Sequence, residues 1–112
     1  MKKDIRVYLE DILESINKIE KYTSQINFEE FGKNTERQDA VMRRLEIIGE
    51  AVKSLPDETK QKCSDIPWKQ IAGMRDVLIH EYSGVSMRRV WRVVENDLKP
   101  LKETTSKILE GL

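Results

Sequence analysis

The chain has 112 residues, and its 20 lysines and arginines are balanced by 20 aspartates and glutamates. This zero net charge excludes a general attraction to nucleic acid, so a polyanion would have to bind at a local patch. No apolar run approaches the ~20 residues of a membrane span, and acidic residues interrupt the first apolar segment, unlike in a signal peptide. The single cysteine, Cys63, suits a reducing compartment. We expect one cytoplasmic domain, residues 1–112, with no membrane contact.

The first expected helix covers residues 4–24. Its apolar residues recur at alternating steps of four and three, which gives a narrow stripe on one face. Asp4 suits the N-cap position, and the Glu and Lys residues of the opposite face are typical of a solvated surface. The apolar positions are Ile5, Leu9, Ile12, Ile16 and Ile19.

A short aromatic segment and a second long helix follow. Residues 27–32 predict a turn or one helical turn, with Phe28 and Phe31 packed inward. Thr35 with Gln38 has the form of a capping box that would open the second helix. Gly49 lies inside this helix and costs about 1 kcal/mol relative to alanine, so we expect a close helix crossing there. The helix should end before Pro56.

The second half of the chain predicts two further helices. Residues 57–63 form a short helix or loop, and residues 68–84 an amphipathic helix with Pro67 in its first turn and Gly84 as its stop. Ser86 can cap the last long element, which Pro100 should kink or interrupt near Asn96. Short connections between amphipathic helices indicate an all-α, up-and-down bundle of four to five helices.

The residues able to support chemistry lie in the segment 68–84. His80, the only histidine, follows Arg75 by five positions and precedes Tyr82 by two. At about 100° per residue, Arg75 and Tyr82 lie within about 20° of each other, whereas His80 lies roughly 140° from Arg75. Either the helix loosens before His80, or the catalytic partners come from two chains.

An imidazole and a guanidinium suffice for RNA cleavage without a metal. His80 can take the proton of a ribose 2′-hydroxyl, and Arg75 can hold the charge that develops on the phosphoryl oxygen. The products would be a 2′,3′-cyclic phosphate and a 5′-hydroxyl. The structural alternative is that Arg75 pairs with a neighbouring acid and His80 interacts with the helix C-terminus. One histidine, one cysteine and no phosphate-binding glycine motif predict no metal and no cofactor.

At these residues the sequence resembles the HEPN superfamily, and within it the HepT toxins. Their signature is an arginine, four residues, a histidine, one residue and a tyrosine, which here is RDVLIHEY, residues 75–82. LEIIGEA (45–51) and VVENDL (93–98) are also similar to the family, so the resemblance covers about residues 36–101. Two positions depart from it, because relatives often have an aromatic residue at Ser83 and asparagine at Arg44.

The resemblance implies the toxin of a type II/VII-like toxin–antitoxin system. It implies a homodimeric HEPN bundle whose two motif helices meet at a cleft, with endoribonuclease activity there. His80 would be the general base, Arg75 the phosphate contact and Asp76 a polar orienting neighbour. A minimal nucleotidyltransferase antitoxin would neutralise the toxin, in some systems by attaching AMP to the tyrosine, here Tyr82. The added bulk and negative charge beside Arg75 should block an anionic substrate.

The sequence also predicts a basic patch that could bind RNA, and it leaves open two alternatives to the ribonuclease function. Five arginines on two helices could contact RNA phosphates, although exposed arginines are usually only a solvated surface. The chain could instead be a non-catalytic helical partner that presents a substrate to a nucleotidyltransferase, or a bundle with a purely structural interface role. The five arginines are Arg43, Arg44, Arg88, Arg89 and Arg92.

Overall fold

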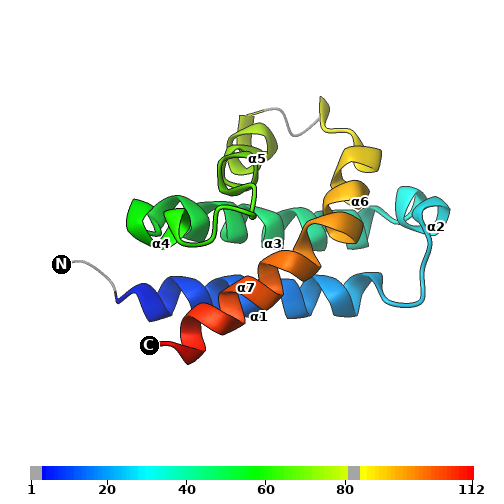
Figure 1. Cartoon of the computed structure of the whole chain (residues 1–112). Coiled ribbons are helices and arrows are strands. Elements are labelled where there is room, and N and C mark those ends of the chain that lie inside the picture. Colours follow the sequence, from blue (N-terminus) through cyan, green and yellow to red (C-terminus); the bar gives the residue numbers. More distant parts are fainter. Residues whose placement is uncertain (1–3, 81–83) are drawn as a thin grey trace.

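The structure, a computed structural model, describes residues 4–80 and 84–112 and confirms the all-α fold class (Figure 1). The helices number seven in these residues rather than four to five, because two are very short and the last predicted element is divided. None of them is long and apolar enough to cross a membrane. Their bounds are α1 Ile5–Thr23, α2 Phe28–Lys33, α3 Thr35–Ser54, α4 Asp57–Gln61, α5 Trp68–His80, α6 Met87–Asn96 and α7 Leu98–Glu110.

The antiparallel pair α1 and α3 forms the base of the bundle (Figure 1). Asp4 caps α1 as predicted, since its side chain accepts a hydrogen bond from the backbone N–H of Arg6 at 2.9 Å. Four of the five residues of the predicted α1 stripe are fully buried and Ile5 is partly buried. Each fully buried leucine or isoleucine contributes roughly 1.5–3 kcal/mol. Core residues from the two helices include Leu9, Ile12, Ile16, Ile19, Val41, Leu45, Ile48 and Val52.

The predicted aromatic plug is the short helix α2. Phe31 is fully buried, and the Trp91 ring of α6 packs on it at 5.1 Å and on Phe28 at 6.3 Å, measured between ring centroids. Asn27 and Glu30 form a capping box, each side chain accepting a hydrogen bond from the other's backbone N–H. The plug therefore joins α2 to α6.

The predicted capping box at the start of α3 is wrong. The N-cap is Asn34, whose side chain accepts a hydrogen bond from the backbone N–H of Arg37 at 3.0 Å. Gln38 instead donates its side-chain amide to the carbonyl of Phe31 at 2.9 Å. Asparagine is at least as good an N-cap as threonine, so the residue before Thr35 takes the position.

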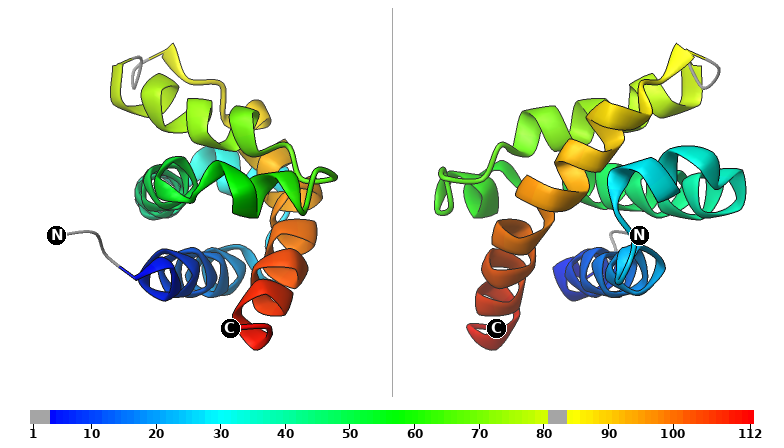
Figure 2. Two further views of the ribbon diagram at one scale, coloured as in Figure 1. Left: turned by 60° about the vertical axis from the view of Figure 1, so that its left-hand side comes forward. Right: turned by 90° about the vertical axis from the view of Figure 1, so that its right-hand side faces the viewer.

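Helices α5, α6 and α7 cross the base pair (Figures 1 and 2). α5 lies over α3 on the side away from α1, while α7 packs on α1. The predicted interruption near Asn96 is confirmed, because α6 ends at Asn96 and Pro100 lies in the first turn of α7, where its missing N–H costs nothing. The predicted stop at Gly84 depends on residues 81–83, which lie outside the described residues.

Candidate active site

Helix α5 carries the motif and is anchored at its N-terminal end. Trp68, Ile71 and Leu78 are buried on the face toward the core. The Trp68 indole N–H donates to the carbonyl of Cys63 at 2.9 Å, and the carbonyl of Pro67 accepts from the backbone N–H of Ile71 at 3.1 Å. These contacts fix the position of α5, and so of the motif residues that it carries, on α3.

The crossing of α3 and α5 occurs at Gly49, as predicted. A Cβ atom at Gly49 would lie 2.7 Å from the Arg75 Cβ and 3.2 Å from the Ile71 carbonyl oxygen. Only a residue without a side chain permits this approach. The backbone of α3 therefore supports α5 directly at the motif arginine.

Arg75 is accessible and only weakly paired. Its Nη1 lies 3.3 Å from the Asp76 Oδ1, with 29% of the Arg75 side chain and 58% of the Asp76 side chain exposed. An exposed ion pair of this kind contributes about 0–1 kcal/mol. A guanidinium has five N–H donors, so most of them can still bind a phosphate.

α5 remains α-helical through His80, so the helix does not loosen before this residue. A loosened helix therefore does not explain how Arg75 and His80 could meet. The explanation that remains is that the two residues come from two chains. Tyr82 lies outside the described residues. The roles of Asp76, His80 and Tyr82 therefore stay predictions.

The five predicted RNA-binding arginines differ in their surroundings. Arg43 Nη1 lies 3.4 Å from the Glu46 Oε2 on the same helix, and Arg44 is half-buried. The Arg88 guanidinium lies over the Phe28 ring, 4.3 Å from its centroid, so it stabilises the aromatic plug. Arg89 and Arg92 are exposed on α6, and neither forms an ion pair within the described ranges.

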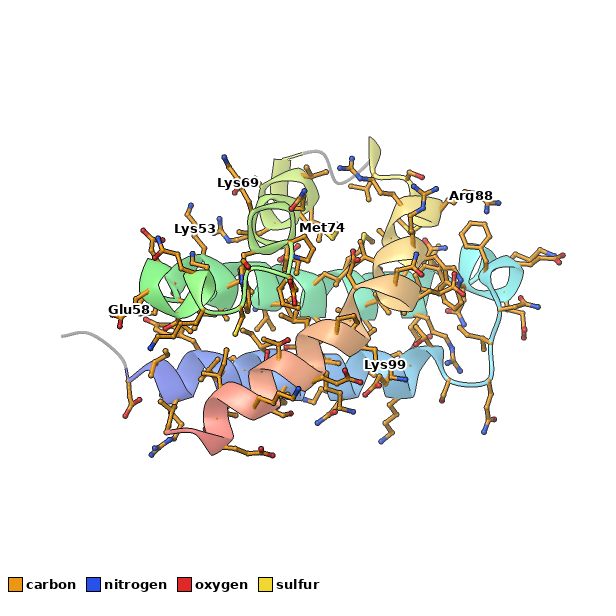
Figure 3. The ribbon with its side chains drawn as sticks, viewed as in Figure 1. Lys53, Glu58, Lys69, Met74, Arg88 and Lys99 are labelled. Carbon is orange, nitrogen blue, oxygen red and sulfur yellow. The ribbon has the colours of Figure 1, made fainter. Side chains whose placement is uncertain are left out.

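A groove of about 470 Å³ lies between α5 and α6, with α3 as its floor. Met74 extends from α5 toward α6, whereas Lys69 points away (Figure 3). Most of the lining is apolar, and the polar groups lie along α6 and at its C-terminal end, except for one on α5. They are Gln70, Arg89, Arg92, Asn96 and Asp97.

Asp97, at the junction of α6 and α7, was not predicted as a site residue. Desolvation by burial raises the pKa of its carboxyl above the ordinary value. Its side chain does not cap α7, nor does it form an ion pair with any residue that the structure describes. The sequence did place Asp97 beside the expected interruption, but only the packing of α5 shows that it lines a groove. Perturbed carboxyls in grooves are candidates for functional residues.

Comparison with known proteins decides the family. The family model described as ribonuclease HepT-like matches residues 12–108. The chain belongs to the HepT-like family. This match includes the motif helix and the whole lining of the groove, so both lie inside the HepT-like domain.

Two relatives show how far the similarity extends. A protein of Methanocaldococcus jannaschii named "Gamma-glutamylcyclotransferase and putative RNase" is 50% identical over 112 residues, which are 100% of this chain and 50% of that protein. A protein of Thermococcus cleftensis named "Probable ribonuclease HepT" is 46% identical over 108 residues, 96% of this chain and 98% of that protein. The HepT-like chain thus spans half of the first relative and nearly all of the second. No solved structure matches it.

Asp97 gives the HepT-like chain a testable pH dependence. Because its pKa is raised in the folded state, the charged carboxylate lowers the free energy of unfolding at neutral pH. This loss of stability should disappear as the pH falls through the raised pKa toward the ordinary value of about 3.9, because the carboxyl is then uncharged in both the folded and the unfolded chain. We expect Asp97→Asn to unfold at a higher temperature than wild type at pH 7, with the difference vanishing near pH 4. A difference that is constant from pH 7 to pH 4 would contradict this.

Proposed function

We propose that the chain is a toxin endoribonuclease that cleaves RNA without a metal. The observation that carries the proposal is the HepT-like match over residues 12–108, which includes an accessible motif arginine on a firmly packed helix. His80 takes the proton of a ribose 2′-hydroxyl, and the 2′-oxygen attacks the adjacent phosphorus. The bond from phosphorus to the 5′-oxygen breaks while Arg75 stabilises the phosphoryl charge.

The active form in this proposal is a homodimer. Because α5 is helical through His80, Arg75 and His80 of one chain start about 140° apart around the helix axis. Two motif helices facing each other would bring Arg75 of one protomer to His80 of the other. The departing 5′-oxygen then takes up the proton that the same His80 removed from the 2′-hydroxyl, and it leaves as a 5′-hydroxyl. The products are a 2′,3′-cyclic phosphate and a 5′-hydroxyl.

The proposed partner is a nucleotidyltransferase antitoxin that attaches AMP to Tyr82. The phosphoester would place bulk and negative charge two residues after His80 in the sequence, where it would repel RNA phosphate. Intact-mass measurement after co-expression with that partner should show the mass of AMP added to the peptide containing Tyr82. An unmodified peptide from a fully neutralised toxin would argue against this step.

Growth and RNA integrity in cells that express wild type or His80→Ala test the proposed activity. We expect only the wild type to arrest growth and cut RNA, since a general base contributes about 10²–10⁴-fold to rate. Lys53→Ala, at an exposed position of α3, is the matched control and should behave like wild type. Equal toxicity of wild type and His80→Ala at matched soluble levels would favour the non-catalytic partner function instead.

The exposed arginines of α6 are proposed to contact RNA phosphates. Each contact to single-stranded RNA adds about 0.7 to the slope of log K against log salt. We expect the double variant Arg89→Gln with Arg92→Gln, on a His80→Ala background, to lower this slope by about 1.4. Lys99→Gln with Lys107→Gln on α7 removes equal charge outside the groove and should leave the slope unchanged. An identical slope for both double variants would count against the contacts.

A further inference from the structure

The groove between α5 and α6 combines apolar walls, positive charge and a carboxylate acceptor. Its charged groups form no ion pair with the described residues. Its walls are apolar, formed by Met74, Val77 and Val93 among others. Arg89 and Arg92 offer unpaired positive charge at the rim. Asp97 offers an acceptor that is unpaired among the described residues, next to the amide of Asn96. Arg89 and Asp97 are eight residues apart, about 12 Å along α6, so a ligand that suits the groove is anionic near Arg89, apolar in its body and rich in hydrogen-bond donors near Asp97.

We propose that the groove is a subsite for a guanine nucleotide. The volume of about 470 Å³ falls within the range of roughly 300–1,000 Å³ of small-molecule sites, which are mostly apolar with a few convergent polar groups. The base would lie between Met74 and Val93, and the phosphate at Arg89 and Arg92. The inference rests on the proposed ribonuclease function for its source of nucleotide, the RNA substrate.

Guanine fits the polar end better than adenine does. Its Watson–Crick edge presents two adjacent donors, N1–H and the N2 amino group, which a carboxylate accepts together, and its O6 can accept from the Asn96 amide. Adenine presents only one amino donor on that edge, and its N1 lone pair would face the Asp97 carboxylate. Asp97 therefore acts as a specificity residue rather than as a catalytic one.

The placement of the groove connects this subsite to the motif. The lining residues of α5 run from Gln70 to Leu78, and His80 is two residues further along the same helix. A nucleotide in the groove would thus lie beside the C-terminal half of the motif helix. An RNA held there by its base would have a neighbouring phosphate within reach of that helix end.

A protein segment fits the groove less well. An acidic amphipathic helix would complement Arg89, Arg92 and the apolar walls, but it would bring negative charge to Asp97, whose carboxylate is already disfavoured by burial. A second copy of the chain is the remaining occupant, and it is an outcome of the test.

The test measures nucleotide binding by titration calorimetry with the full-length His80→Ala chain. We expect guanosine 5′-monophosphate to bind about tenfold more tightly than adenosine 5′-monophosphate, the discrimination expected of a bidentate contact to a base. Asp97→Asn on this background should abolish the preference without lowering the unfolding temperature at pH 7, which a merely structural role would not produce. Asp65→Asn, at an exposed carboxylate before α5, is the control and should keep the preference.

Two further arms identify the source of the nucleotide and the competing occupant. A short RNA with one guanosine should displace guanosine 5′-monophosphate, whereas the same RNA with adenosine in its place should do so about tenfold less well. Equal binding of the two monophosphates, or none, would overturn the subsite. So would dissociation of a dimer by Val93→Asp, which changes the α6 wall and not the motif helix, because the groove would then hold a second copy. Binding is measured without cleavage, so a chain that binds guanosine but never cuts RNA would refute only the ribonuclease.

Discussion

Mixed dimers of an Arg75→Ala chain and a His80→Ala chain should cleave RNA, although neither variant does so alone. If Arg75 of one protomer acts with His80 of the other, a mixed dimer has one site that lacks both residues and one intact site. Each single variant should lose about 10²–10⁴-fold in cleavage rate. Mixed dimers isolated by two different affinity tags should recover about half of the wild-type rate, since one of two symmetric sites is intact.

The matched control is the double variant Arg75→Ala with His80→Ala, paired with wild type in the same way. Its mixed dimers contain one Arg75 and one His80, both from the wild-type protomer, so no site has an arginine and a histidine from different chains. Two-chain sites therefore predict that these control dimers are as inactive as the single variants. Active control dimers beside inactive complementing dimers would show instead that both residues act within one chain.

The regular parts of the fold were predictable because they depend on short-range physics. The stripe of α1 requires only a period of 3.6 residues, and its members Leu9, Ile12, Ile16 and Ile19 are fully buried. The interruption near Asn96 follows from proline chemistry. The cap of α3 was not predicted, since Asn34 and Thr35 both suit the position and the choice depends on where α2 ends.

In the candidate site, too, the features that depend on local sequence could be predicted and those that depend on packing could not. The motif residues are contiguous in sequence, and Gly49 was marked by its cost within a helix. The groove could not be predicted, because it exists only where α5 and α6 lie over α3, and residues 70 and 97 are brought together by packing. No local pattern distinguishes Asp97 from the many other acidic residues of this chain. What distinguishes Asp97 is its burial in the folded chain, which raises the pKa of its carboxyl.

Gly49→Ala should lower the free energy of unfolding and reduce cleavage together. The new Cβ would lie 2.7 Å from the Arg75 Cβ and 3.2 Å from the backbone oxygen of Ile71, and neither atom is the end of a flexible side chain. α5 must therefore shift away from α3. Overpacking of this kind costs about 1–3 kcal/mol, and the gain of about 1 kcal/mol from replacing a helical glycine offsets only part of it. Thermal and urea unfolding measure the loss.

Gly73→Ala makes the same change in the helix that Gly49 supports, and it should have the opposite effect on stability. Apart from its chain neighbours and the backbone of its own helix, nothing lies within 4 Å of a Cβ at Gly73, so only the helical gain of about 0.5–1 kcal/mol remains. If both variants were stabilised, α3 and α5 would have room to separate at no cost, and the close crossing would not position Arg75. If Gly49→Ala alone loses stability and cleaves RNA more slowly per folded molecule, the crossing holds the motif arginine in place, and a position on α3 controls chemistry on α5.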